Sequence, residues 1–177
     1  MAGKTYHGFT LMILIKRGVV IALTKGFSTI IDYDDLYKIK PYKWFYSNRY
    51  ARAYTGGGRA SPKRIAMHRL ILDMPDDCGF EVDHIDGNGL NNQRNNLRIC
   101  TRAENNRNCR KLSVSSSKYK GVTFDKQTGK WRTEITFNYK RIRLGRFSNE
   151  EEAARVYDKA ALKYHGAFAK INFEIVS

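Results

Sequence analysis

Residues 81–105 of the chain read EVDHIDGNGLNNQRNNLRICTRAEN. The pattern predicts a strand at Phe80–His84, a tight polar loop at Asp86–Asn92 and a returning strand at Leu97–Cys100. Thr101 then has the character of a helix N-cap, and Glu104 three residues later completes a capping box. The stretch therefore predicts a ββα unit that gathers His, Asp and Asn side chains.

These side chains suit phosphodiester cleavage, which needs a base to activate water and a cation to stabilise the phosphate charge. Because neighbouring strand residues point to opposite faces, a twist or bulge must bring Asp83 and His84 to one site. The alternative is a surface turn rich in Asx residues, which are common in loops. The density of polar residues in this stretch favours a site.

Three groups of residues occur here in order, namely VDHIDGN at 82–88, NNLR at 95–98 and TRAEN at 101–105. This series resembles the HNH endonuclease family, in particular the phage intron-homing branch, which has Asn in the last motif position. The resemblance covers about residues 64–110. It implies a ββα-metal fold and metal-dependent cutting of DNA.

The resemblance also implies roles for single residues. His84 would be the general base, and Asn96 would orient its imidazole through a hydrogen bond. Asp83 and Asn105 would hold one divalent ion, Mg²⁺ or Mn²⁺, since hard oxygen ligands suit such ions. An Asn instead of a His in the last position disfavours zinc and nickel.

Some of these assignments have close competitors in the sequence. Asn95 competes with Asn96, while Asn106 and Asn108 compete with Asn105. His68 fits a pattern common before this motif, and it either packs or contacts the DNA backbone.

The charge of the chain points to the same partner. The 177 residues suit one medium domain or two small ones, and 32 Lys and Arg against 17 acidic residues give a net charge of +15. An excess of this size indicates a polyanion such as double-stranded DNA, with a solubilising surface charge as the alternative. No basic amphipathic helix suggests a membrane surface.

The cysteines and the apolar N-terminal stretch indicate the compartment. Cys78, Cys100 and Cys109 show no C-x-x-C spacing, which argues against a zinc knuckle and a disulfide scaffold. The apolar stretch Phe9–Leu23 is interrupted at residues 16–18, so it predicts a β-hairpin and neither a transmembrane segment nor a signal peptide. We expect a cytoplasmic protein in a phage or bacterial host cell.

We divide the chain into a nuclease domain at 1–110, a Ser-rich flexible linker at 111–118 and a second domain at 119–177. The nuclease domain has a β-rich lead at 1–72 and a ββα-metal core at about 73–110. Within the lead, the pattern predicts strands at Leu11–Ile15, Val19–Thr24 and Ser28–Asp32, a short helix at Asp34–Ile39, and a turn at Gly56–Gly58 between Tyr50–Tyr54 and Arg64–Leu72. Residues 1–60 carry no motif with evident chemistry; they brace the nuclease or add DNA contacts through Arg49, Arg52 and Lys63.

The second domain reads as a three-stranded antiparallel sheet packed on one helix, so the fold class is α+β. Strands are predicted at Tyr119–Phe124, Trp131–Phe137 and Arg141–Phe147. The helix runs from Asn149 to about His165. We expect Ser148 as its N-cap, Glu151 as the capping-box partner and Gly166 after its end.

Alternation along these strands sorts their side chains into two faces. Trp131, Ile135, Ile142 and Leu144 would meet the helix. Arg132, Arg141 and Arg143 would point outward with Lys120 nearby. A basic sheet face can enter the major groove of DNA, whereas a merely solvated face is the alternative.

Several short motifs here resemble the apetala-two/ethylene-response-factor DNA-binding domain over about residues 117–173. They are SKYKGV at 117–122, KW at 130–131, LGRF at 144–147, EEAA at 151–154, YDKAA at 157–161 and NF at 172–173. The resemblance implies a sheet docked in the major groove. Lys120, Glu134 and Arg141 fall where plant members place contacts.

The resemblance does not extend to the target sequence. Thr123, Thr136 and Arg143 replace residues that plant members use to read bases. The Leu-Gly and Tyr-Asp-x-Ala-Ala residues are chiefly structural.

Together the two domains predict a DNA endonuclease that acts as a monomer or homodimer, with an architecture resembling mobile endonucleases of phages or integrated elements. Two other functions compete with it. One is a transcription regulator that keeps an inactive nuclease fold, and the other is a general nucleic-acid chaperone with little sequence preference.

Overall fold

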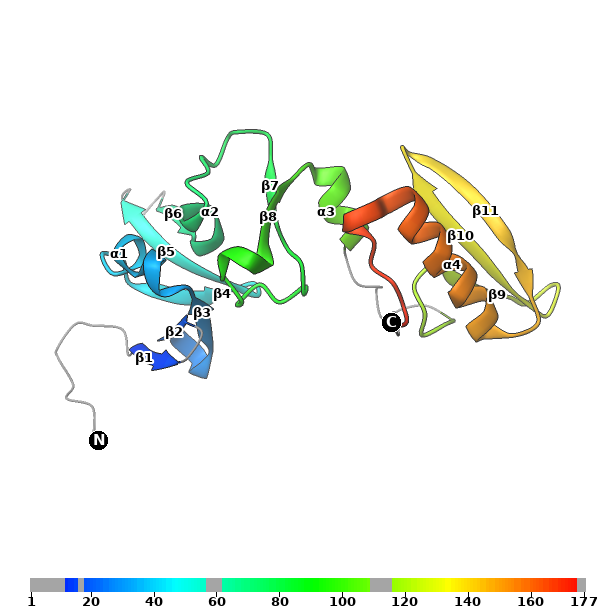
Figure 1. Ribbon diagram of the computed structural model, residues 1–177, viewed down its shortest axis with the longest axis horizontal. Coiled ribbons are helices and arrows are strands. Elements are labelled where there is room, and N and C mark those ends of the chain that lie inside the picture. Colours follow the sequence, from blue (N-terminus) through cyan, green and yellow to red (C-terminus); the bar gives the residue numbers. More distant parts are fainter. Residues whose placement is uncertain (1–11, 16–17, 57–61, 109–115, 175–177) are drawn as a thin grey trace. The chain divides into compact units, whose positions relative to one another are not determined.

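A computed structural model describes residues 12–15, 18–56, 62–108 and 116–174 (Figure 1). The chain forms two compact units, which divide between Thr101 and Arg102. Both contain strands and helices, so the expected α+β class is confirmed. Parts of the predicted strand Leu11–Ile15, of the turn Gly56–Gly58 and of the linker 111–118 lie outside the described residues.

The first unit contains two three-stranded antiparallel sheets, a two-stranded hairpin and two short helices. The first sheet has β1 (Met12–Ile15), β2 (Gly18–Ala22) and β3 (Ser28–Ile31); the second has β4 (Trp44–Ser47), β5 (Tyr50–Gly56) and β6 (Lys63–Ala66). The hairpin pairs β7 (Glu81–His84) with β8 (Leu97–Cys100), and the helices are α1 (Leu36–Ile39) and α2 (Met67–Ile71). Three 3₁₀ turns lie at Thr24–Gly26, Tyr33–Asp35 and Arg94–Asn96.

One apolar core joins strands β2 to β8 with α1 and α2. Its fully buried residues include Ile31 of β3, Ile39 of α1 and Ile71 of α2, and Val82 of β7 and Leu97 of β8 pack on the same cluster. The β-rich lead and the hairpin are thus built as one body, because the apolar residues of the hairpin pack into the core of the lead.

One segment of the lead differs from the expectation. The stretch 64–72 was expected as a single element after the turn, but it divides into β6 and α2. Met67 and Ile71 are fully buried and four residues apart, a spacing that places both on the same side of a helix.

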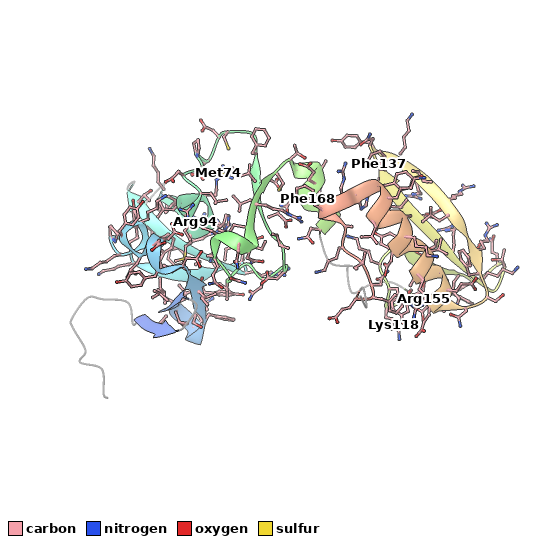
Figure 2. The ribbon with its side chains drawn as sticks, in the orientation of Figure 1. Met74, Arg94, Lys118, Phe137, Arg155 and Phe168 are labelled. Atoms are coloured by element: carbon pink, nitrogen blue, oxygen red, sulfur yellow. The ribbon has the colours of Figure 1, made fainter. Side chains whose placement is uncertain are left out.

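The second unit holds α3 (Arg102–Asn108), a three-stranded antiparallel sheet and α4 (Glu150–His165). The sheet order is β9 (Val122–Asp125), β10 (Lys130–Phe137) and β11 (Lys140–Phe147), and Phe137 ends the central strand (Figure 2). A 3₁₀ turn at Gly166–Phe168 follows α4. The three strands and the helix were predicted, with ends that shift by up to three residues.

The N-cap of α4 differs from the prediction by one residue. The side chain of Asn149, not Ser148, accepts hydrogen bonds from the backbone N–H groups of Glu151 and Glu152 at 2.8 and 3.0 Å. Asn is as good an N-cap as Ser. Gly166 follows the helix with φ of 55°, as expected.

Small residues let α4 lie close to the sheet. Ala153, Ala154 and Ala161 are fully buried, and Tyr157 is 3% exposed. At Gly121, with φ of +78°, an added Cβ would lie 1.9 Å from a ring carbon of Tyr157. The contact therefore requires glycine. Among the described helices, none has the length and apolar character to cross a membrane.

Candidate nuclease site and DNA-binding face

The Asp83–His84 pair lies at the end of β7 and is almost completely buried, with exposures of 4% and 5%. The pairing with β8 is regular through both residues, Asp83 opposite Arg98 and His84 opposite Leu97, so no bulge turns them. The two side chains consequently meet different partners.

Asp83 is bound by an arginine. Its Oδ2 accepts hydrogen bonds from Nε and Nη2 of Arg98 at 2.8 and 2.5 Å. The guanidinium fork neutralises a carboxylate that would otherwise be costly to bury. An ion at Asp83 would have to share this carboxylate with Arg98 or displace it.

His84 is held by an amide and by two rings. Its Nε2 lies 3.2 Å from Oδ1 of Asn92, and its ring centroid lies 5.1 Å from that of His68 and 5.8 Å from that of Tyr50. Burial lowers the pKa of His84, and the neighbouring Asn92, Asp86 and Asp83 oppose this only partly. The imidazole is therefore neutral near neutral pH, as a general base must be.

Asn96 does not make the contact that was expected of it. Its Oδ1 accepts from the backbone N–H of Asp86 at 3.0 Å, and its Nδ2 donates to Asp86 Oδ1 at 3.0 Å and to the Asn91 carbonyl at 2.8 Å. Asn96 thus closes the loop after β7, and the contact with the imidazole of His84 belongs to Asn92. The sequence offered no signal for this exchange, because both lie in one run rich in Asn.

His68 packs against the site from α2. Its ring meets the rings of Tyr50 and His84 edge to face, with centroids 5.2 and 5.1 Å apart. Burial, with His84, Arg69 and Arg52 nearby, lowers the pKa of His68 to about 3. Packing, one of the two roles considered for His68, is therefore present in the structure.

Three arginines of the first unit form ion pairs with carboxylates, and Arg52 on β5 is not among them. Arg94 pairs with Asp35 at 2.6 Å, Arg98 with Asp83 and Arg69 with Asp76 at 3.2 Å. Within the described residues, Arg52 forms no ion pair, although it lies close enough to His68 to lower its pKa. Arg52 is thus a cation next to His68, which in turn packs against the candidate base His84.

The donor chemistry at Asp83 fits Mg²⁺ or Mn²⁺, which prefer hard carboxylate and amide oxygens. Within the described parts of the chain, no group of three or more His, Cys, Asp or Glu is arranged to hold a metal. Asn105 lies on α3, which by its contacts belongs to the second unit. A metal held by Asp83 and Asn105 therefore stays a prediction.

The predicted DNA-contacting residues of β10 and β11 come together on one side of the sheet. Glu134 lies among three arginines, with N–O distances of 3.4 Å to Arg132, 3.7 Å to Arg141 and 4.0 Å to Arg143. The side chains of Arg141 and Arg143 are 71% and 86% exposed. We call these four residues together with Arg146 the arginine face.

Arg146 was missed by the alternation rule because β11 carries a bulge. Glu134 pairs with Arg143 but Thr133 pairs with Gly145, so Leu144 is an extra residue and the alternation shifts beyond it. Arg146 thereby comes opposite Arg132 and forms an ion pair with Asp125 at 3.5 Å. A hollow of about 330 Å³ is lined by Gly121, Val122, Thr123, Arg132, Glu134, Thr136 and Arg141.

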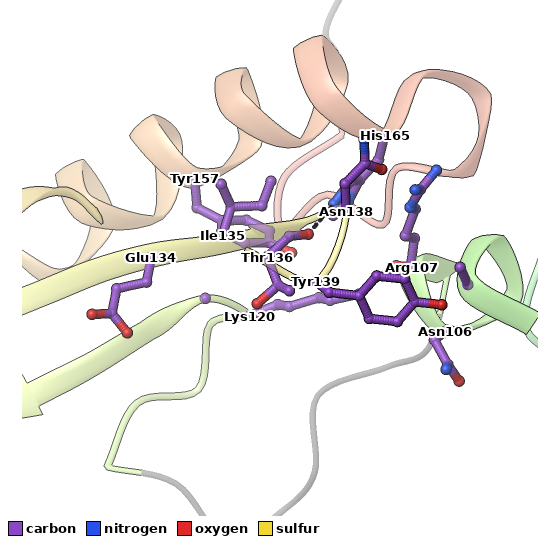
Figure 3. Close-up of a pocket in the computed structure, with 12 residues that line it drawn as sticks. Asn106, Arg107, Lys120, Glu134, Ile135, Thr136, Asn138, Tyr139, Tyr157 and His165 are labelled. Atoms are coloured by element: carbon purple, nitrogen blue, oxygen red, sulfur yellow. Dashed lines mark hydrogen bonds between the residues drawn. The ribbon is translucent and has the colours of Figure 1, made fainter. Parts of the chain in front are cut away.

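Lys120 lines a different cavity of the second unit, of about 390 Å³ (Figure 3). Its Nζ donates to the carbonyl of Arg107 at 2.5 Å. In the same cavity His165 Nε2–H donates to the Thr136 carbonyl at 3.0 Å. Burial lowers the pKa of His165, and Arg107 and Lys120 lower it further. A contact of Lys120 with DNA stays a prediction.

Comparison with known proteins finds two families, and the first match extends past Thr101 into α3 of the second unit. Residues 66–107 match the HNH endonuclease family model, and residues 117–167 match the AP2 domain model. The chain carries an HNH endonuclease domain and an AP2 domain. Both kinds of domain bind DNA, so DNA is the partner that they indicate.

The curated relatives resemble the AP2 domain. Identity is 47% over 60 residues with APETALA2-like protein 2 of Oryza sativa subsp. indica, covering 34% of this chain and 14% of that protein. It is 48% over 60 residues with the AP2-like ethylene-responsive transcription factor TOE2 of Arabidopsis thaliana, covering 34% and 12%. The chain thus spans only 12–14% of the length of these relatives.

Proposed function

We propose that this protein is a metal-dependent DNA endonuclease of the homing type, in which the HNH domain cuts and the AP2 domain binds the target. The observation that carries the proposal is the His84 imidazole, which is buried, neutral and held by Asn92 at 3.2 Å within the region that matches the HNH family. A neutral imidazole can accept a proton from water, a step that DNA binding alone does not require.

In the proposed reaction His84 accepts the proton of the attacking water. Its depressed pKa keeps the accepting lone pair available near neutral pH. One divalent ion, Mg²⁺ or Mn²⁺, held by Asp83 and Asn105, would supply stabilisation of the charge on the phosphate and on the leaving oxygen. Arg52, which lacks an ion pair among the described residues, attracts the DNA phosphates to this side of the unit.

The AP2 domain adds binding energy and a preferred site. Its arginine face presents exposed guanidinium groups, which bind guanine edges and phosphates of the major groove. Because both domains are in one chain, binding of one raises the local concentration of the other at the DNA. The net charge of +15 favours association with any duplex.

The test is incubation of supercoiled plasmid and of a genomic DNA library with the purified full chain in Mg²⁺, in Mn²⁺ and in EDTA. We expect cleavage only with metal, at sites that sequencing of the ends maps. In His84→Ala we expect cleavage to fall by about 10²–10⁴-fold, the usual contribution of a general base. A gel-shift assay should show DNA affinity within about twofold of wild type, as an uncharged site residue contributes little to phosphate binding.

The second candidate function is transcriptional regulation, favoured by the name of the 48% identical relative TOE2, a transcription factor. It predicts a stable gel shift without nicking in every metal. Full cleavage activity in His84→Ala would instead support the nuclease function but contradict the role of His84 as the general base.

A further inference from the structure

The loop that follows the candidate base is attached to β3 of the N-terminal lead. The backbone N–H of Ile30 donates to the Leu90 carbonyl at 3.0 Å, and the N–H of Asn92 donates back to the Ile30 carbonyl at 2.8 Å. The Thr29 hydroxyl also lies 2.7 Å from the Leu90 carbonyl. The chain thus brings Thr29 to a loop about 60 residues away.

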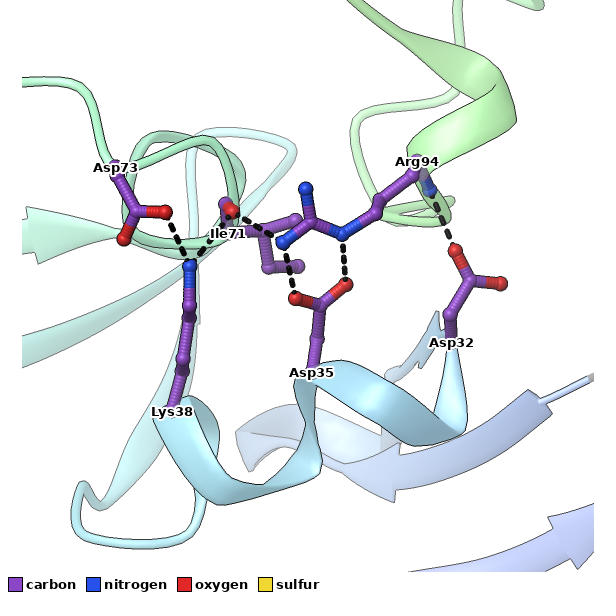
Figure 4. Close-up of polar contacts among 6 residues, drawn as sticks. All are labelled: Asp32, Asp35, Lys38, Ile71, Asp73 and Arg94. Atoms are coloured by element: carbon purple, nitrogen blue, oxygen red, sulfur yellow. Dashed lines mark hydrogen bonds and ion pairs between the residues drawn. The ribbon is translucent and has the colours of Figure 1, made fainter.

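Hydrogen bonds and an ion pair hold the end of the same loop to Asp32 and Asp35 (Figure 4). Asp32 accepts from the backbone N–H of Arg94 at 2.8 Å and from Gln93 Nε2 at 3.0 Å. Both oxygens of Asp35 bind the Arg94 guanidinium, at 2.9 and 2.6 Å. The position of the loop relative to β3 is therefore fixed from two sides.

The donor and acceptor capacity of each group then determines which atom donates in the hydrogen bonds that link Leu90, Thr29 and Asn92. The Leu90 carbonyl only accepts, so the Thr29 hydroxyl donates its hydrogen there. Thr29 Oγ1 must then accept from Asn92 Nδ2, which lies 2.8 Å away. Asn92 is 0% exposed and Thr29 is 2% exposed, so water offers no alternative partner.

With its amide nitrogen directed at Thr29, Asn92 presents Oδ1 to His84. This oxygen only accepts, so Nε2 of His84 must carry the hydrogen across the 3.2 Å contact. A neutral imidazole with hydrogen on Nε2 has its lone pair on Nδ1.

We propose that Asn92 and Thr29 are positioning residues that fix the tautomer of His84, so that Nδ1 is the atom that takes the proton from water. The N-terminal lead thus belongs to the catalytic apparatus through Thr29. The part of this proposal that concerns proton transfer rests on the proposed nuclease function, whereas the tautomer itself does not.

The first measurement is the tautomer, read from ¹⁵N–¹H long-range correlation spectra of the full chain near neutral pH. We expect the His84 signals of an Nε2–H imidazole in the wild type. In Thr29→Val, which removes the hydroxyl at similar size, Asn92 is free to rotate and a second tautomer should appear. Thr29→Ser restores the hydroxyl and should restore the wild-type spectrum.

The second measurement is cleavage kinetics of the same variants. Thr29→Val should lower kcat at least about tenfold with KM within about twofold, since a wrong tautomer affects proton transfer more than binding. Thr29→Ser should recover most of the rate. Thr24→Val is the matched control, because it removes a hydroxyl of the same unit that contacts the Tyr46 N–H and not the His84 loop.

Two outcomes would overturn the proposal: an Nδ1–H imidazole in the wild type, or Thr29→Val with an unchanged spectrum and kcat. If the wild type cuts no DNA while the spectra behave as expected, the nuclease function fails and the hydrogen-bond chain stands. If Thr29→Val merely unfolds the protein, Thr29→Ala, which also lacks the hydroxyl, decides against the same spectrum.

Discussion

The two units use their functional side chains in opposite ways. In the first, Asp83 and His84 are 4% and 5% exposed and are bound by Arg98 and Asn92. In the second, the side chains of Arg141 and Arg143 are 71% and 86% exposed around Glu134. The side chains assigned to chemistry are thus buried in one unit, whereas those assigned to recognition are exposed in the other.

This difference in exposure determines how many hydrogen-bond partners the functional side chains of each unit need from the rest of the protein. A buried polar group must have partners, because leaving one unsatisfied costs about 1–3 kcal/mol. The site therefore requires Thr29, which lies 63 residues before Asn92. An exposed arginine finds water for its N–H groups, so the arginine face requires only a sheet behind it.

The largest effect on stability should come from the buried contact between the sheet and α4 in the second unit. In Gly121→Ala the new Cβ would overlap the Tyr157 ring at 1.9 Å, so α4 must move away from the sheet. We expect a loss of stability of at least about 3 kcal/mol, confined to the second unit. Hydrogen-exchange mass spectrometry of the full chain reports both units separately and should show faster exchange in β9–β11 and α4 only.

Gly129→Ala is the matched control for this substitution. Gly129 also has a positive φ, of 64°, but nothing lies within 4 Å of its added Cβ. We expect only the backbone cost of about 1–2 kcal/mol. Equal effects of the two substitutions would mean that the close approach of Tyr157 contributes nothing, and exchange that spreads to β7 and β8 would break the distinction between the units.

A smaller effect, on binding and not on folding, should follow from Arg141→Ala combined with Arg143→Ala. If both guanidinium groups contact DNA, affinity should fall by about 10–100-fold and the slope of log affinity against log salt should decrease by about 2. Stability should change little, since both side chains are exposed. Fluorescence anisotropy with a mapped target duplex over a salt series measures both quantities.

Lys159→Ala combined with Lys163→Ala removes the same charge from the exposed side of α4. This control should lower affinity by less than about threefold through the general field alone. If the two pairs have the same effect, net charge and not the arginine face accounts for binding by this unit.

Much of the second unit could be predicted from its sequence. Alternation from Trp131 to Phe137 places Glu134 outward and Ile135 inward, as the structure does. The bulge at Leu144 could not be predicted, because a strand with one extra residue has the same composition as a regular one. Arg146 was missed for this reason.

For the buried site, the sequence indicated the residues but not their contacts. The motif spacing picked out Asp83 and His84, and the hairpin strands Glu81–His84 and Leu97–Cys100 lie where they were expected. It assigned the imidazole contact to Asn96 in place of Asn92. The direction of a loop side chain depends on tertiary partners such as Thr29, and no local pattern encodes those.

An effect that appears only as the pH falls concerns His68, a buried group in the first unit. Within the described residues, Nδ1 of His68 is buried without a hydrogen bond, and the pKa of His68 falls from 6.5 to about 3. The unfolded chain therefore binds a proton first as the pH falls, so stability is complete above the unfolded pKa and declines below it.

His68→Gln removes this titration, and urea unfolding of both proteins at about pH 7 and about pH 5 should reveal it. At about 1.4 kcal/mol per pKa unit, the wild type should lose about 2 kcal/mol more than the variant between these pH values. Parallel losses would show that water or a rotation satisfies His68 Nδ1 in solution. The first unit would then tolerate a polar side chain without a protein partner, as the arginine face does. The two units would not differ in this requirement merely because one site is buried and the other is exposed.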